Sequence, residues 1–267
     1  MLNLTKAYLY RMLRTKAAWV CMLILVGMTA LSISVSYMET KLMSSLMEDA
    51  GAEIVTEEDP EGSQGSILDE YMGIIQNGFN VMIFGIFTAV FYNSDEKHGY
   101  IKNLVTQYSR RSGILLPRML SLGAYVLGVS LLNFILSAIL LKCFYPGMPL
   151  GLKGAAFGYM GMHFLLLLTI LMIVLFIATL ARGTALAVAY SVCASMNMAG
   201  LLALPLNFLA RRFLHIQKPN VAKYFLETYL FNVQGAEHVW SLVLLFVCYA
   251  GAAALLSCLL LDQRDVR

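Results

Sequence analysis

Charge is scarce in this sequence. Only 13% of its 267 residues are Asp, Glu, Lys or Arg, whereas 59% are hydrophobic. An ordinary water-soluble domain carries about twice that share of charge, so the composition excludes a sizeable soluble domain and indicates a protein that is solvated by lipid. The formal net charge of +3 is too small to suggest a nucleic-acid partner.

Motifs for catalysis and metal binding are missing as well. The sequence has no GxxxxGK[ST] phosphate loop, no GxSxG nucleophile elbow and no HExxH zinc motif. Its five cysteines are scattered without a CxxC pair, which gives no basis for a disulfide framework. We therefore expect no catalytic residue, no metal site and no cofactor bound by this chain itself.

Long apolar runs are what the sequence has instead. The length of each run is close to what a helix needs to cross the hydrocarbon core of a membrane, which is about 20 residues. We predict an all-α, polytopic membrane protein, a single transmembrane domain over residues 1–267. Its six predicted spans are 17–35, 71–92, 119–141, 157–181, 184–206 and 239–261. The second is the weakest, because Gln76, Asn77 and Asn80 interrupt its first half.

The distribution of basic residues predicts the orientation. Six spans place both termini on the same side, and that side carries twelve of the nineteen Lys and Arg residues, against seven on the other. Because loops rich in Lys and Arg stay in the cytoplasm, we expect both termini to be cytoplasmic.

The first external loop, predicted over 36–70, holds ten of the sixteen acidic residues. Its part 57–65 is rich in acids, Gly and Ser, a composition that favours a solvated loop. The simpler interpretation is an acidic cap that keeps the outer surface soluble. The alternative is an electrostatic attraction for cationic peptides.

Two further segments are amphipathic. Residues 1–16 can form an interfacial helix along the inner membrane surface, although a short tail that only supplies positive charge explains them equally well. Residues 207–238 are too polar for lipid but rich in aromatics, and we expect short helices at the outer interface between spans five and six, broken at Pro219. An ordinary loop with aromatics in the interfacial belt is the alternative.

The cytoplasmic connection over 93–112 has the clearest pattern. Gly99 allows a sharp turn, and the apolar residues that follow at helical spacing predict a short amphipathic helix. Asp95 and Glu96 come just before it, where acids favour a helix N-terminus. Such a helix suits a groove in a partner protein. It can also lie on the inner leaflet, with Arg110 and Arg111 on lipid phosphates.

This segment resembles the signature of type-2 ABC exporter permeases, which commonly reads E-x-x-x-G-T-I-K-x-L followed by S-R. The matching residues are Asp95, the run Gly-Tyr-Ile-Lys-Asn-Leu at 99–104 and Ser-Arg at 109–110. The six-span layout, the internal termini and the closing run at 262–266 are similar to that family too. The sequence departs from the pattern at Asp95, where Glu is common, at Tyr100, where Thr is common, and at Pro117-Arg118, where a Lys often precedes the third span.

The resemblance implies a membrane subunit that works with a separate ATP-binding cassette protein and with a second permease copy, in a bacterial cell membrane. ATP and Mg would then bind to the partner subunit. Exported amphipathic or cationic peptides are the implied substrate, and hydrophobic drugs or lipid-linked glycans are the alternatives. An intramembrane enzyme or a non-ABC scaffold remains a competing class. The coupling residues would be Asp95, Glu96, Gly99, Tyr100, Ile101, Lys102, Leu104 and Val105.

Polar residues inside the predicted spans are the other candidates, because a polar side chain in a membrane usually serves a function or joins two helices. Asn80 and Asn197 are the candidates for a substrate path. Asn133 and His163 are expected mainly to join helices by hydrogen bonds.

Overall fold

The computed structural model describes residues 2–49, 66–97, 111–151, 154–181, 183–214, 220–231 and 239–263. Every regular element in these ranges is a helix. The elements are α1 (Leu2–Arg14), α2 (Lys16–Asp49), α3 (Ile67–Ile75), α4 (Phe79–Lys97), η1 (Arg111–Ile114), α6 (Leu115–Phe144), α7 (Gly154–Ala181), α8 (Thr184–Ser195), α9 (Met198–Leu214), η2 (Val221–Tyr224), η3 (Leu226–Leu230) and α10 (Val239–Gln263).

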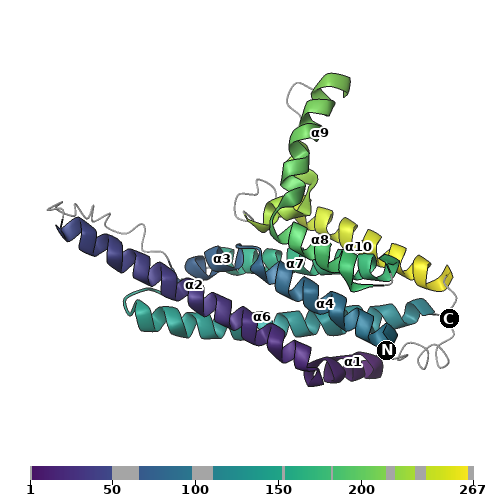
Figure 1. Ribbon diagram of the computed structural model, residues 1–267, viewed down its shortest axis with the longest axis horizontal. Coiled ribbons are helices and arrows are strands. Elements are labelled where there is room, and N and C mark those ends of the chain that lie inside the picture. The colour runs from purple at the N-terminus through teal and green to yellow at the C-terminus, as the bar shows by residue number, and fades with distance from the viewer. Residues whose placement is uncertain are drawn as a thin grey trace.

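The helices form an elongated bundle (Figure 1). α7 lies at its centre and packs against α4, α8 and α10, while α2 packs against α4 and α6. The middle of α7 supplies much of the core, with Leu166, Leu167, Ile170, Leu171 and Val174 fully buried. Bulky apolar side chains also cover the outside of the bundle, as expected where lipid is the solvent.

Four described helices, α2, α6, α7 and α10, are each long and apolar enough to cross a membrane. Two bent helix pairs raise the number of candidate spans to as many as six. The chain is therefore a helical transmembrane protein with four to six candidate spans. The boundaries 119–141, 157–181 and 239–261 predicted from hydropathy lie inside α6, α7 and α10.

The second and fifth predicted spans are not continuous helices. α3 and α4 meet at a bend of 53°, and α8 and α9 meet at a bend of 75°. Gly78 has a φ of +77° at the first break and Asn197 a φ of +51° at the second, a backbone region that Gly and Asn tolerate best. The predicted spans 71–92 and 184–206 are therefore each divided between two helices at these breaks.

α2 is longer than predicted. Its 34 residues span about 50 Å, well beyond a hydrocarbon core of about 30 Å. The helix continues past Val35 because neither Gly nor Pro occurs from Met28 to Asp49. The expectation of a loop from residue 36 onward is therefore wrong for 36–49. Figure 1 shows this end of α2 reaching past the neighbouring helices.

The far end of that predicted loop is helical too. Ser66 caps α3 through a reciprocal capping box with Asp69, and the backbone N–H of Ile67 donates to the carbonyl of Pro149 at 3.0 Å. Two of the acids assigned to a loop, Asp69 and Glu70, thus belong to the first turn of α3, where they favour the helix. The acids over 50–65 lie outside the described residues.

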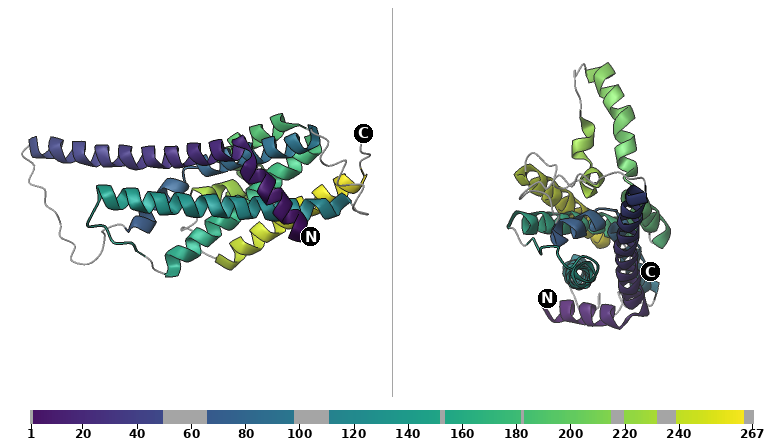
Figure 2. Two further views of the ribbon diagram at one scale, coloured as in Figure 1. Left: turned by 90° about the horizontal axis from the view of Figure 1, so that it is seen from below. Right: turned by 90° about the vertical axis from the view of Figure 1, so that its left-hand side faces the viewer.

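α1 confirms a helix at residues 2–14, but one side of it packs on protein. Leu4, Tyr8 and Met12 are spaced four residues apart and are buried, and α1 contacts α6. The two views of Figure 2 show α1 crossing α6 on one side of the bundle, close to one of its ends. At the turn from α1 into α2, the hydroxyl of Thr15 donates a hydrogen bond to the carbonyl of Met12 at 2.7 Å.

Candidate functional site: a buried ion cluster and two helix breaks

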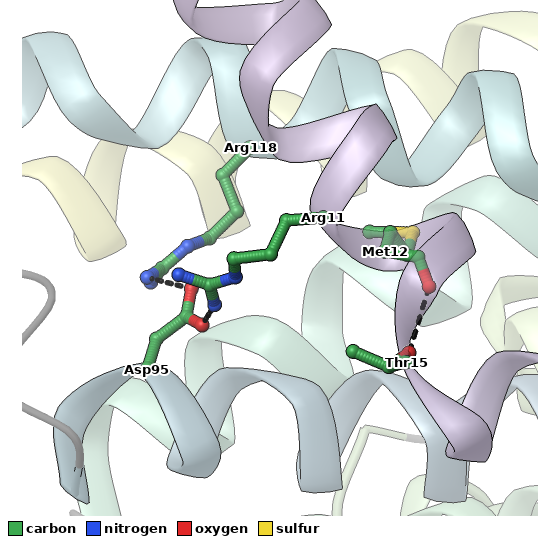
Figure 3. Close-up of polar contacts among 5 residues, drawn as sticks. All are labelled: Arg11, Met12, Thr15, Asp95 and Arg118. Atoms are coloured by element: carbon green, nitrogen blue, oxygen red, sulfur yellow. Dashed lines mark hydrogen bonds and ion pairs between the residues drawn. The ribbon is translucent and has the colours of Figure 1, made fainter.

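Asp95 is the most unusual side chain at the α1 end of the bundle. It lies in the last turns of α4, its carboxylate is fully buried, and it is held by two arginines from two other helices (Figure 3). Nη2 of Arg118, near the start of α6, donates to Oδ2 of Asp95 at 2.6 Å. Arg11 of α1 forms an ion pair with Oδ1 through its own Nη2. One carboxylate therefore connects α1, α4 and α6.

Aromatic rings enclose the two guanidinium groups. The Arg118 guanidinium carbon lies 4.8 Å from the ring centre of Tyr92 and 5.5 Å from that of Tyr8. The Arg11 guanidinium carbon lies 5.1 Å from the ring centre of Phe91. Guanidinium groups over aromatic faces gain electrostatic attraction while water is excluded, which strengthens the ion pairs. The three ionised side chains together carry one excess positive charge.

The exposure of the two arginines differs. The Arg118 side chain is 4% exposed, whereas the Arg11 side chain is 29% exposed and can be rehydrated from the surface of the bundle. Loss of the carboxylate would therefore leave Arg118 as an unpaired buried cation, a far more costly state than an exposed one. Arg118 is the tighter partner of Asp95, and Arg11 is the partner that can exchange with water.

Both predicted acids belong to α4. Asp95 and Glu96 lie at its C-terminal end, which is Lys97, and the helix predicted to follow them lies outside the described residues. A helix C-terminus disfavours acids, so the arginines rather than a helix dipole stabilise the Asp95 carboxylate. The Glu96 side chain and the other predicted coupling residues lie outside the described part of the chain; these are Gly99, Tyr100, Ile101, Lys102, Leu104 and Val105.

Sequence reasoning missed the partners of Asp95. From the sequence, Arg11 indicates only the orientation of the chain, and Arg118 is only a departure from the Lys that often precedes the third span. The usable signal was the presence of ionisable residues at the ends of three apolar segments, since such groups seldom stay buried unless they are paired.

The two helix breaks meet each other inside the bundle. A Cβ added at Gly78 would come within 2.2 Å of the carbonyl oxygen of Ser195, the last residue of α8. Farther along the same contact, a Cβ at Gly85 would come within 2.3 Å of Oγ of Ser191. Gly78, just before α4, and Gly85, on α4, thus allow α8 to approach closely, which brings the break before α4 beside the break after α8.

Both predicted path residues lie at this crossing. Asn80 is in the first turn of α4, and Asn197 forms the second break itself. Oδ1 of Asn197 and Nε2 of Gln76 are buried without a hydrogen-bond partner among the described residues. Broken helices place such unpaired polar groups inside a membrane protein.

The two residues expected to join helices behave differently. The hydroxyl of Thr29 in α2 donates to Oδ1 of Asn133 in α6 at 2.8 Å, so the prediction is confirmed for Asn133. His163 in α7 is 4% exposed, and neither of its ring nitrogens has a hydrogen-bond partner in the described structure. The prediction is therefore wrong for His163.

The segment between α9 and α10 contains the 3-10 helices η2 and η3, and α9 extends into it as far as Leu214. The amphipathic helices expected at the outer interface stay a prediction. Glu227 of η3 is 7% exposed and accepts a hydrogen bond from the hydroxyl of Tyr190 in α8 at 2.9 Å. The hydrogen bond between Tyr190 and Glu227 fixes η3 to the bundle. Tyr229 lies in the same short helix, and partial burial raises the pKa of its hydroxyl. Pro219, where a break was predicted, lies outside the described residues.

No cluster of three or more His, Cys, Asp or Glu side chains that could hold a metal occurs within the described ranges. The site therefore has two parts, which are the end of α4 held by the ion pairs of Asp95 and the polar residues at the crossing of the two helix breaks. Comparisons with protein families, with curated proteins and with solved structures found no match for this chain.

Proposed function

We propose that this chain is the transmembrane permease subunit of an ATP-driven ABC exporter. The observation that carries the proposal is the position of the ion cluster relative to the segment that resembles the family signature. Asp95 lies three residues before the segment 98–110, and Arg118 lies eight residues after it. One buried ion pair therefore joins α4, which precedes this segment, to α6, which follows it.

This arrangement suits the transmission of force. An ATP-binding cassette partner that docks on residues 98–110 would push on the ends of α4 and α6 together, because the Asp95–Arg118 pair joins them. Arg11 adds α1 to the same unit. Motion of the docked segment would then reach α4 as a rigid displacement. α4 carries Asn80 at its other end, beside the two helix breaks.

The proposed path runs along this crossing, with Asn80 and Asn197 exposed to the substrate. The proposed substrate is an amphipathic or cationic peptide, attracted by the acidic residues that follow α2. ATP and Mg would bind on the cassette subunit, and a second permease copy would complete the exporter. Both termini would face the cytoplasm of a bacterial cell, consistent with the distribution of Lys and Arg.

Co-expression with candidate phosphate-loop ATPases tests the proposal. Neighbouring reading frames are the natural source of candidates. We expect one of them to co-purify with this chain and to hydrolyse ATP. Changing the apolar side of the predicted coupling helix to Ser should abolish assembly; these residues are Ile101, Leu104 and Val105.

The matched control changes Asn103 and Thr106 to Ser, because these residues line the other sides of the same predicted helix. Assembly should survive the control. Assembly that also survives the apolar triple substitution would contradict docking through this side of the helix.

A further inference from the structure

A cavity of about 230 Å³ lies between α3, α4, α6 and α7, away from the ion cluster. Its wall is mostly apolar and includes Leu127 and Leu131 of α6 and Phe157 of α7. Tyr71, Asn80, Ser130 and His163 supply the polar groups. The cavity is smaller than most drug-binding pockets but large enough for several water molecules or for part of an acyl chain.

His163 is the polar group that the protein leaves unused. Its imidazole carries one donor and one acceptor when neutral, and neither has a partner among the described residues. The Tyr71 hydroxyl, by contrast, donates to the carbonyl of Ser130 at 3.3 Å. Buried polar groups in proteins nearly always find a partner, so an unpaired imidazole lining a cavity points to a group that enters the cavity.

The rim of the cavity indicates where that group comes from. Leu127, Leu131 and Phe157 line the cavity and are also 43%, 46% and 50% exposed on the outside of the bundle. That surface consists of membrane-spanning helices, so an apolar molecule in the bilayer can reach it directly. Among the described residues that line the cavity there is no Asp, Glu, Lys or Arg, which disfavours a charged occupant because its charge would be buried unpaired.

We propose that this cavity binds an uncharged amphiphile from the bilayer. Its apolar chain lies against Leu127, Leu131 and Phe157, and its single hydroxyl or carbonyl group forms a hydrogen bond with the imidazole of His163. The inference rests on the cavity and on the unpaired imidazole, and it does not depend on the proposed export function.

Photolabelling of the purified chain in lipid nanodiscs tests this site. The probe is a medium-chain primary alcohol carrying a diazirine, and the comparison probe is the matching alkane without the hydroxyl group. We expect the alcohol to label residues of the cavity wall and to be displaced by unlabelled alcohol. His163→Phe should lower labelling of the wall by the alcohol about tenfold, the effect of losing one buried hydrogen bond, and leave labelling by the alkane unchanged. His163→Gln should retain it, because Gln keeps a donor and an acceptor.

Two neighbouring positions on α6 supply a matched pair of controls. Leu131→Trp should block labelling by both probes, whereas Leu132→Trp should not, because Leu132 is similarly exposed but does not line the cavity. A second measurement uses the native chain with ¹⁵N-labelled histidine, in which the His163 imidazole resonances should shift with alcohol and not with alkane. Labelling spread evenly over the exposed sides of all helices would overturn the proposal. His163 resonances whose chemical shifts do not change when the alcohol is added would overturn it as well.

Discussion

Removing the Asp95 carboxylate should destabilise the bundle strongly. In Asp95→Asn, the Arg118 guanidinium stays buried, with 4% of its side chain exposed, and loses its charged partner at 2.6 Å. Breaking a buried ion pair in this way costs about 3–5 kcal/mol. Coulomb's law at an effective dielectric constant of about 20 gives a similar figure, about 4 kcal/mol for charges about 4 Å apart.

The other substitutions should follow in a defined order. Arg118→Gln should cost less than Asp95→Asn, because the buried carboxylate keeps its ion pair with Arg11. Arg11→Gln should cost only about 1 kcal/mol, because its side chain is 29% exposed and the attraction is screened by water. The double variant Asp95→Asn with Arg118→Gln removes both charges together and should be less destabilised than either single variant.

Reversible unfolding in mixed micelles, followed by helical circular dichroism, measures these differences. The informative quantity is the coupling free energy between positions 95 and 118 in the double-mutant cycle, which should exceed about 2 kcal/mol. Additive effects, or single substitutions that cost less than about 0.5 kcal/mol, would refute the buried cluster.

Three further predictions concern other parts of the bundle. Gly78→Ala should destabilise it by about 2 kcal/mol or more, because φ is +77° and a methyl group would overlap a carbonyl of α8. Gly73→Ala should instead stabilise it by about 0.5–1 kcal/mol, because a methyl group at this position of α3 meets open space. Thr29→Val should cost about 1 kcal/mol by removing the bond to Asn133, whereas Thr88→Val, whose hydroxyl donates only within its own helix, should cost less; thermal unfolding separates the two. Neutralising four of the acids that follow α2 should weaken export of a cationic peptide at low salt and have little effect on it at high salt; the residues are Glu57, Glu58, Asp59 and Glu61. Unchanged transport at low salt would contradict the electrostatic attraction.

Hydropathy predicts the long helices well because a helix that crosses a membrane needs a long run of apolar residues. The two helix breaks are harder to predict from the sequence. Gln76 and Asn77 marked the first break as a polar interruption, but averaging over a span-length window merged it with the apolar residues that follow. Asn197 stands alone in an apolar run, and only its left-handed backbone reveals the second break.

The ion cluster shows a different limit of the sequence. Arg11, Asp95 and Arg118 come from three segments far apart in the chain, and each had an adequate local explanation as a topology signal or a family motif residue. Pairing between them depends on how α1 crosses α6, which hydropathy does not encode. His163 was misjudged for a related reason: a polar residue in a span predicts that some partner exists, but not whether that partner belongs to the protein.

Photo-crosslinking from residue 101 tests the central claim most directly. A photoreactive amino acid replaces Ile101 in one variant and Met38 in another, since Met38 is 70% exposed on α2 and is expected on the outer side. In cells that co-express the candidate ATPase, we predict a cross-link to the ATPase from position 101 and none from position 38. A cross-link from position 38, or only lipid adducts from position 101, would contradict the account.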